Sequence, residues 1–279
     1  RCIIKSGKQS RKNSGRENVK GWSNMLNYNL KRHHWALITG ASSGIGKEFA
    51  FQIAEKGLNV IILGRNAEQL SKVADEIHNA TNSSVVIIQA DLVKELDSVL
   101  ENLSRFDVDL LVNNAGIGLY GDFIQHSWEE YENMMKLNME VLTKLSYHYA
   151  KNFVKKGFGG IINVASVAGF MPIPHFAVYG ATKAYVYSFS MSLWAELKDK
   201  GIHVLCVAPG KTETKFFERA KMDPGKQLMK PSEVVRGALN AYEKGSPLYI
   251  PGVSNKLIYH FVRRFFSDKF VAKMLVKYF

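Results

Sequence analysis

The sequence predicts an α/β fold: a doubly wound parallel sheet of about seven strands, with helices on both faces. Two observations predict it. First, short apolar runs of strand length alternate with helical patterns between residues 31 and 252, which is typical of parallel strands buried on both faces. Second, a glycine-rich turn from Thr39 to Gly46 follows the first run, where such folds connect their first strand to their first helix.

The predicted strands, in chain order, are residues 35–39, 59–63, 84–90, 110–113, 160–165, 202–208 and 247–250. The longest helical patterns cover about residues 127–155 and 178–200. Because no linker or internal repeat interrupts this order, residues 31–252 are predicted to form one domain.

Residues 253–279 predict two short, basic amphipathic helices. Apolar residues follow helical spacing up to Phe266, Ser267 is expected to cap the second helix, and the pattern restarts at Phe270. Three interpretations stay open, because amphipathicity does not distinguish a protein core from lipid. The helices pack on the domain or in a dimer contact, form one wall of an apolar substrate cleft, or lie on an anionic membrane surface.

The net charge of +12 is concentrated at the two ends of the chain. Residues 1–24 hold seven Lys/Arg against Glu17, and residues 244–279 hold seven against Asp268. Residues 25–243 therefore hold 23 basic and 23 acidic residues, and a neutral body argues against nucleic-acid binding. Residues 1–30 are polar and lack apolar periodicity, which predicts a basic, disordered tail.

Cys2 and Cys206 are the only cysteines, so no disulfide framework is predicted, and we expect no metal. No stretch reaches the roughly 18 uninterrupted apolar residues of a membrane-spanning helix. The expected location is cytoplasmic, peripheral to a membrane if residues 254–279 touch lipid.

Tyr179 and Lys183 are the first candidate catalytic residues. Their spacing of four residues places both on one face of a helix. An ammonium beside a phenol favours the phenolate, so Lys183 is expected to lower the pKa of Tyr179. Tyrosine can then act as an acid and a base near neutral pH. Ser166, thirteen residues before Tyr179, and Asn138 complete the candidate set.

A second pair, Tyr147 and Lys151, has the same spacing. Thirteen residues before Tyr147, however, stands Met134 rather than a hydroxyl donor. We therefore expect this pair to have no catalytic role.

The glycine-rich turn predicts a pyrophosphate site, because glycines let backbone N–H groups approach the phosphates and the following helix adds positive potential. The second strand ends in Gly64 and Arg65. In NAD-binding folds an acidic residue near this position holds the ribose 2′-hydroxyl, whereas a guanidinium pairs with a 2′-phosphate. Arg65 therefore favours NADP(H) over NAD(H).

With these motifs the sequence resembles the short-chain dehydrogenase/reductase family, in its compact single-domain branch, over about residues 31–252. The family's Thr-Gly-x-x-x-Gly-x-Gly stands here as Thr39 to Gly46, and Asn-Asn-Ala-Gly as Asn113 to Gly116. NADP-preferring members often carry a second basic residue in the glycine loop, where this chain has Ser42 and Ser43. The NADP(H) preference therefore rests on Arg65.

The resemblance also implies a Rossmann fold and a set of cofactor contacts. Asp91 matches the position that contacts adenine, and Pro209-Gly210 with Thr214 match the segment that closes over the nicotinamide. The expected cofactor-binding residues are Gly40, Ser42, Ser43, Gly44, Ile45, Gly46, Arg65, Asp91, Leu92, Asn114, Ala115, Gly116, Tyr179, Lys183, Pro209, Gly210, Thr212 and Thr214.

The resemblance implies a role for each candidate catalytic residue. Tyr179 exchanges a proton with the carbonyl or alcohol oxygen, and Ser166 hydrogen-bonds that oxygen as charge develops. Lys183 holds the nicotinamide ribose, and Asn138 positions a water that links Lys183 to solvent.

The function expected from this resemblance is an NADP(H)-dependent oxidoreductase that interconverts a secondary alcohol and a ketone. Its substrate is expected to be small and apolar, a 3-oxoacyl, steroid-like or xenobiotic carbonyl compound bound near residues 116–126 and 211–230. The expected assembly is a homodimer or homotetramer. The alternative is a cofactor-binding regulatory protein, or a membrane-associated lipid-handling protein, without significant turnover.

Overall fold

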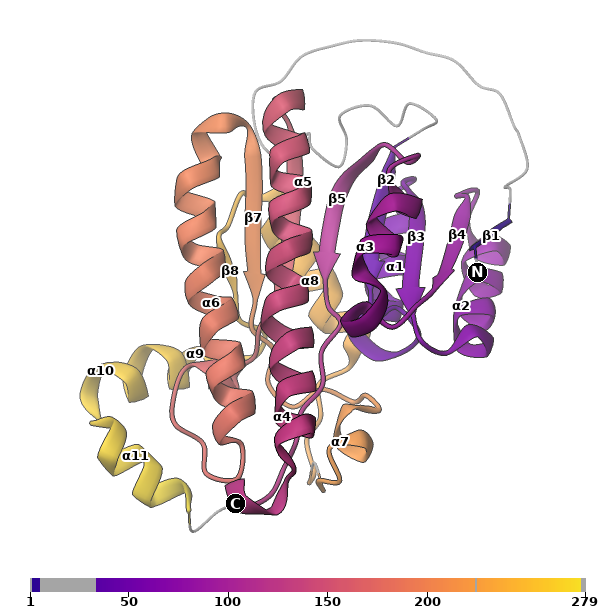
Figure 1. Cartoon of the computed structure of the whole chain (residues 1–279). Coiled ribbons are helices and arrows are strands. Elements are labelled where there is room, and N and C mark those ends of the chain that lie inside the picture. Colours follow the sequence, from indigo (N-terminus) through magenta and orange to yellow (C-terminus); the bar gives the residue numbers. More distant parts are fainter. Residues whose placement is uncertain (1, 6–33, 224, 277–279) are drawn as a thin grey trace.

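The structure, a computed structural model, describes residues 2–5, 34–223 and 225–276 (Figure 1). Its centre is an eight-stranded sheet of order β1-β4-β3-β2-β5-β6-β7-β8. The strands are β1 Cys2–Lys5, β2 Trp35–Thr39, β3 Asn59–Gly64, β4 Val85–Gln89, β5 Val108–Asn113, β6 Gly159–Val164, β7 Ile202–Val207 and β8 Leu248–Tyr249. Strands β2 to β8 are parallel, which confirms the predicted doubly wound sheet.

Helices cover both faces of this sheet. The α-helices are α1 Gly44–Glu55, α2 Ala67–Ala80, α3 Leu92–Leu103, α4 Trp128–Met135, α5 Leu142–Lys156, α6 Ala177–Leu197, α7 Phe216–Arg219, α8 Pro231–Glu243, α9 Val253–Leu257, α10 Arg263–Phe265 and α11 Asp268–Leu275. Two π-helical turns, η3 Lys136–Val141 and η6 Ile258–Val262, join α4 to α5 and α9 to α10. Short 3₁₀ turns are η2 Phe123–Gln125, η4 Val167–Gly169 and η5 Lys198–Lys200.

The strand β1 differs from the sequence prediction of a disordered tail over residues 1–30. It pairs antiparallel with β4, with Cys2 opposite Ile88 and Lys5 opposite Val85. The open edge of β4 offers unpaired backbone groups, and two consecutive isoleucines favour a strand there. The rest of the predicted tail lies outside the described residues.

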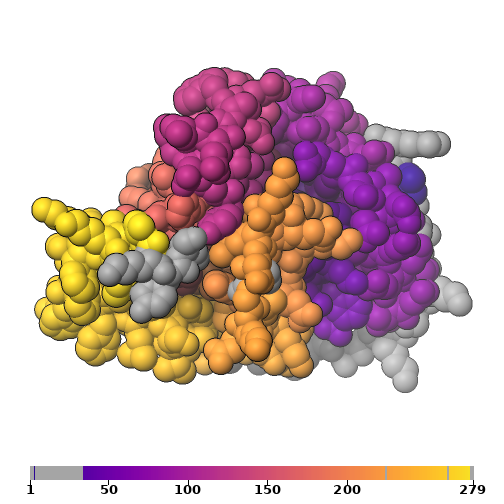
Figure 2. Space-filling view, turned by 90° about the horizontal axis from the view of Figure 1, so that it is seen from below, coloured from indigo at the N-terminus to yellow at the C-terminus, as the bar shows by residue number. Residues whose placement is uncertain are grey.

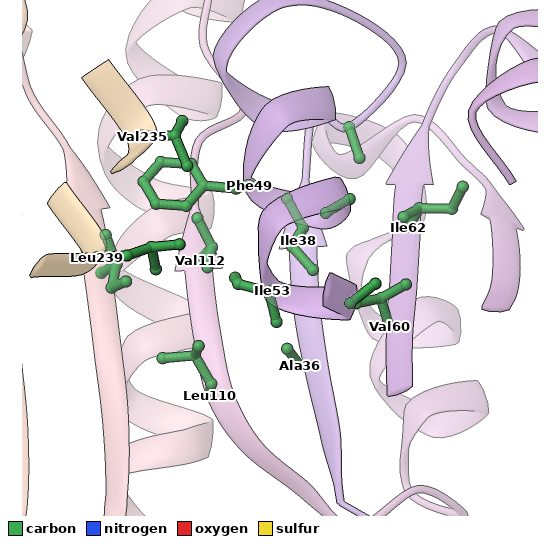
Figure 3. Close-up of a cluster of buried hydrophobic side chains, with 14 of the residues drawn as sticks. Ala36, Ile38, Phe49, Ile53, Val60, Ile62, Leu110, Val112, Val235 and Leu239 are labelled. Carbon is green, nitrogen blue, oxygen red and sulfur yellow. The ribbon is translucent and has the colours of Figure 1, made fainter. Parts of the chain in front are cut away.

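One face of the sheet packs against α1, α2 and α8. Phe49 and Ile53 of α1 and Leu239 of α8 lie on strand residues such as Ile38 and Val112, and all five are buried (Figure 3). Successive strand residues point to opposite faces, so the neighbours of these residues form a second cluster. That cluster packs against α3, α5 and α6 on the other face.

The strand order reverses between β2 and β5. From β2 the chain runs outward through β3 and β4, and then returns to β5 on the other side of β2. The loops that follow β2 and β5 therefore diverge and leave a crevice at the carboxyl ends of the strands, where ligands bind in doubly wound folds. Along the described part of the chain, no helix has the length and apolar character needed to span a bilayer.

Candidate active site

A large cleft opens at this crevice, with a volume of about 1250 Å³. Its walls come from the loops after β2, β3, β4, β5, β6 and β7, together with residues of the C-terminal helices. Every expected cofactor-binding residue lines this cleft except Gly46. Of the four candidate catalytic residues, Ser166, Tyr179 and Lys183 line it, and Asn138 is buried behind its wall.

The glycine turn is closely packed against the loop after β5. Gly40 has a φ of +66°, and a Cβ added at Gly46 would lie 2.3 Å from the Gly40 carbonyl oxygen and 2.4 Å from Asn114 Nδ2. Only glycine fits at position 46. Its role in the structure is therefore to bring α1 against the turn, whereas Ser42 to Ile45 line the cleft.

Asn114 fixes the shape of the turn from the other side. Its Nδ2 donates to the carbonyl oxygens of Thr39 at 3.0 Å and Gly40 at 3.2 Å. The Thr39 hydroxyl in turn accepts from the backbone N–H groups of Asn114 and Ala115. The loops that follow β2 and β5 are thus held together where the cofactor is expected.

The cleft is electrically positive. Seven of its lining residues are basic and two are acidic. Arg65 lies at the end of β3 on the cleft wall, and among the described residues no carboxylate lies within ion-pair distance of it. The first turn of α1 also faces the cleft, and Ser43 at its N-cap makes no side-chain cap. These features suit a phosphate-bearing ligand.

Tyr179 lies near the start of α6 with only 7% of its surface exposed. Ser166 follows β6 and caps the η4 turn: its hydroxyl accepts from the N–H of Ala168 at 3.2 Å and donates to the carbonyl oxygen of Pro209 at 3.4 Å. Burial raises the pKa of the Tyr179 phenol to about 12, and hydrogen bonding with Ser166 opposes this rise only in part.

This result corrects the expectation that Lys183 lowers the pKa of Tyr179. Lys183 Nζ lies 5.8 Å from the centroid of the Tyr179 ring and donates to the carbonyl oxygen of Val164 at 2.9 Å. Lys183 is itself buried, and loss of hydration lowers its pKa from 10.5 to about 8. Loss of hydration therefore determines the pKa values of both groups more than their interaction with each other does.

Asn138 sits in the π-helical turn η3 and is 1% exposed. Its amide clamps the loop after β5: Nδ2 donates to the carbonyl oxygen of Ile117 at 2.9 Å, and Oδ1 accepts from the Ile117 N–H at 3.0 Å. Nδ2 also donates to the hydroxyl of Thr182, next to Lys183. A Cβ at Gly116 would lie 3.1 Å from Asn138 Oδ1 and 3.4 Å from Lys183 Nζ, so glycine lets these groups approach.

The second Tyr-Lys pair lies elsewhere. Tyr147 is 65% exposed on α5 and does not line the cleft. Lys151 Nζ is 3.5 Å from its hydroxyl oxygen. Only the Tyr179 and Lys183 pair therefore lies at the cleft.

Several cleft residues were not singled out from the sequence. Phe216, at the start of α7, lies with its ring 5.2 Å from the Tyr179 ring and against Gly118, where a Cβ would lie 2.4 Å from the Phe216 ring. Phe176 flanks Tyr179 on another side at 5.3 Å. The only available signal was that Phe216 falls within the expected substrate loop, 211–230.

A group of potential metal ligands lies away from the cleft. His34, Asp107 and Asp109 meet at the amino ends of β2 and β5, and Lys156 bonds both carboxylates. The ammonium group thereby offsets one of the two negative charges and occupies an oxygen of each carboxylate.

Residues 34–224, more than half of the chain, match the short chain dehydrogenase family, and the protein belongs to this family of oxidoreductases. Mouse 17-beta-hydroxysteroid dehydrogenase type 3 is 36% identical over 179 residues, 63% of this chain and 59% of that protein. Very-long-chain 3-oxoacyl-CoA reductase of Meyerozyma guilliermondii is 34% identical over 194 residues, 65% of this chain and 57% of that protein.

Solved structures agree with this assignment. A short-chain dehydrogenase from Sphingobium yanoikuyae in complex with NADPH has a TM-score of 0.77 and 34% identity, and the match covers 81% of this chain and 90% of that chain. The chain spans about three fifths of the length of the two curated relatives above.

Proposed function

We propose that residues 31–252 form the catalytic domain of an NADP(H)-dependent oxidoreductase that interconverts a secondary alcohol and a ketone, acting in reduction on an apolar carbonyl compound. The observation that carries this proposal is the meeting of Tyr179, Ser166 and Lys183 on one wall of a positive cleft. The residues fit the cofactor, because the glycine turn and Arg65 line the same cleft, and backbone N–H groups and a guanidinium suit the pyrophosphate and a 2′-phosphate.

In the proposed reaction NADPH supplies the hydride. Tyr179, which holds its proton because burial raises its pKa to about 12, donates that proton to the carbonyl oxygen. Ser166 hydrogen-bonds the same oxygen as negative charge develops. Lys183, held by the Val164 carbonyl, places a positive charge near the phenol as its proton leaves, and Asn138 holds the neighbouring loop in position.

The substrate side of the cleft supports an apolar ketone. Phe176 and Phe216 flank the Tyr179 ring, and Met222, Ile258 and Leu275 line the same cleft. The relatives named above act, by their names, on hydroxysteroids and 3-oxoacyl thioesters. Steroid-like ketones and 3-oxoacyl compounds are therefore the first substrates to test.

The reaction is tested by following NADPH absorbance with 3-oxoacyl thioesters, steroid ketones and small aromatic ketones. We expect Tyr179→Phe to abolish turnover while NADPH still binds, because the ring keeps its packing and loses only its proton. Tyr147→Phe is the matched control and should keep most of the activity. Equal collapse of both variants would contradict the assignment of Tyr179.

The cofactor preference is tested separately by Arg65→Ala. Loss of charge-assisted hydrogen bonds to a 2′-phosphate costs about 1.5–3 kcal/mol, or roughly a 10- to 150-fold weaker NADPH affinity. NADH affinity should change little, because NADH lacks that phosphate. An equal loss for both cofactors would refute the role of Arg65 and favour NAD(H).

The alternative function is a regulatory or lipid-handling protein that binds the cofactor without significant turnover. It would gain support if NADPH binds but no ketone in the panel is reduced faster than by the Tyr179→Phe variant. Assembly into a homodimer or homotetramer and a cytoplasmic location remain predictions of the sequence.

A further inference from the structure

The C-terminal segment, residues 253–276, exposes an unusual amount of apolar surface. Of the sixteen exposed large hydrophobic side chains in the described part of the chain, eight lie in these 24 residues, with exposed fractions from 40% to 74%. Figure 2 shows the segment in yellow, projecting at one side of the molecule beside the segment around α7. The eight side chains are Val253, Leu257, Phe261, Phe265, Phe266, Phe270, Met274 and Val276.

These side chains form ordered stripes rather than scattered contacts. On α11, Val271 is buried and Leu275 lines the cleft. The residue before each of them, Phe270 and Met274, is exposed. Lys269 and Lys273, one position earlier again, are exposed next to them. Residues three and four apart share a helix face, so α11 carries an inward stripe, an exposed apolar stripe and a basic stripe.

The preceding helices repeat this arrangement. Every fourth residue from Leu257 through Phe261 to Phe265 is exposed and apolar. The residues just before them, Lys256, His260 and Arg264, are polar or basic and exposed. The Phe261 and Phe265 rings lie 5.7 Å apart, and in the next turn Phe266 stacks on Phe270 at 5.2 Å. The aromatic surface therefore continues from α10 to α11. Ser267 is the N-cap of α11, as predicted from the sequence.

The segment has a net positive charge. It holds five lysines and arginines and a single acidic residue, Asp268. By contrast, the exposed Ile124 and Trp128 lie beside Asp122, Glu129 and Glu130. A second copy of the segment packed on the first would bring like charges together, whereas an anionic surface would complement them.

The segment is anchored to the catalytic domain at the cleft. The hydroxyl groups of Tyr259 and Tyr187 lie 2.9 Å apart, and the Tyr259 ring lies 4.7 Å from the Phe170 ring, just after the η4 turn capped by Ser166. Asn255 of α9 packs on Gly210, where a Cβ would lie 2.5 Å from its amide. Ile258 and Leu275 then line the cleft itself.

From these observations we propose that α9 to α11 form a docking surface for an anionic lipid bilayer. The exposed phenylalanines insert among the acyl chains, and Lys256, Arg264, Lys269 and Lys273 lie at the head-group level. The same segment closes one side of the cleft, so docking places the mouth of the cleft beside the lipid. As a consequence that rests on the proposed function, an apolar ketone dissolved in the bilayer reaches Tyr179 without crossing water.

The docking surface is tested by co-sedimentation of the full chain with vesicles. We expect binding to vesicles of phosphatidylcholine with about 30 mol % phosphatidylserine, and weaker binding to phosphatidylcholine alone. The triple variant Phe261→Ser, Phe265→Ser, Phe270→Ser should lose binding to both. The triple variant Lys256→Gln, Lys269→Gln, Lys273→Gln should bind the anionic vesicles about 100-fold more weakly, at roughly fivefold for each charge.

The control is the double variant Ile124→Ser, Trp128→Ser, which removes exposed apolar surface from an acidic part of the molecule. It should bind vesicles like the unmodified chain. Equal binding by the phenylalanine variant, or an equal loss in the control, would overturn the proposal. Sedimentation velocity without lipid tests whether a second copy of the chain covers this surface instead. If the unmodified chain is a dimer and only the phenylalanine variant is a monomer, the surface belongs to a contact between two copies.

Two further measurements separate this proposal from the proposed reaction. NADPH binding, measured by its fluorescence, should be the same in the phenylalanine variant and the unmodified chain, which also shows that the variant is folded. Turnover of a vesicle-dissolved ketone should fall in that variant, whereas turnover of a water-soluble ketone should not. Vesicle binding without any turnover would leave the docking surface standing and refute the reaction.

Discussion

Replacing Lys183 with methionine is expected to make the protein more stable at neutral pH while removing its activity. Burial lowers the pKa of Lys183 from 10.5 to about 8, and a fall of this size corresponds to about 3 kcal/mol against the charged side chain at pH 7. Methionine has a similar length and no charge. It loses the hydrogen bond to the Val164 carbonyl, which costs about 1 kcal/mol. The expected net gain in the free energy of unfolding is about 2 kcal/mol.

The sign of the stability difference between the variant and the unmodified chain depends on pH. Below a pH of about 8 Lys183 is charged in the folded and the unfolded chain, so the full cost of burying the ammonium is present. Between about 8 and 10.5 the folded protein releases the proton first, and the stability of the unmodified chain rises with pH. Above 10.5 the cost is gone, and only the lost hydrogen bond distinguishes the variant, which should then be the less stable form.

The assay is urea unfolding of both proteins at about pH 7 and about pH 10, with the free energies compared by linear extrapolation. Tyr179, whose pKa is raised to about 12, affects both proteins alike. Lys151→Met, at an exposed lysine, is the control and should change stability little at either pH. A Lys183→Met protein that is less stable at neutral pH, or a difference that does not vary with pH, would refute the reasoning.

Three other changes test the site. Gly46→Ala places a Cβ 2.3 Å from the Gly40 carbonyl oxygen; we expect a loss of about 1–3 kcal/mol in urea unfolding and weaker NADPH binding, and unchanged values would contradict the packing role. Phe216→Ala removes the ring beside Tyr179, so KM should rise for a bulky ketone and not for a small one. Reduction of ketones, followed as kcat/KM, should fall as pH rises through about 8, where Lys183 loses its charge; a flat profile to pH 10 would exclude Lys183 as the titrating group.

The sequence was sufficient for the parallel strands and for the grouping of the site. Each parallel strand is an apolar run between polar turns, so the pattern alone locates it to within two residues. Parallel strands end at one edge of the sheet, which is why Gly40, Ser166 and Pro209 could be expected around one cleft although they are far apart in the chain.

The remaining features depend on three-dimensional packing and could not be predicted in this way. Strand β1 depends on the open edge of β4, which no local pattern reveals. The pKa of Tyr179 depends on how much of its ring is buried under Phe176 and Phe216, and not on its spacing from Lys183. Helical spacing indicated two amphipathic helices at the C-terminus, but only the structure distinguishes the residues that line the cleft from those that face outward.

The π-helical turn η3 joins α4 to α5 and lets side chains on either side of it face their separate partners. Within η3, Asn138 must point at Ile117. In α5, Ser146 must point at Asn113. Each residue of an α-helix advances by about 100°, so deleting Glu140 would turn one of these side chains away from its partner by roughly that angle. The stretch from 136 to 141 should therefore accept a change of residue type at Glu140, its one exposed position, and not a change of length.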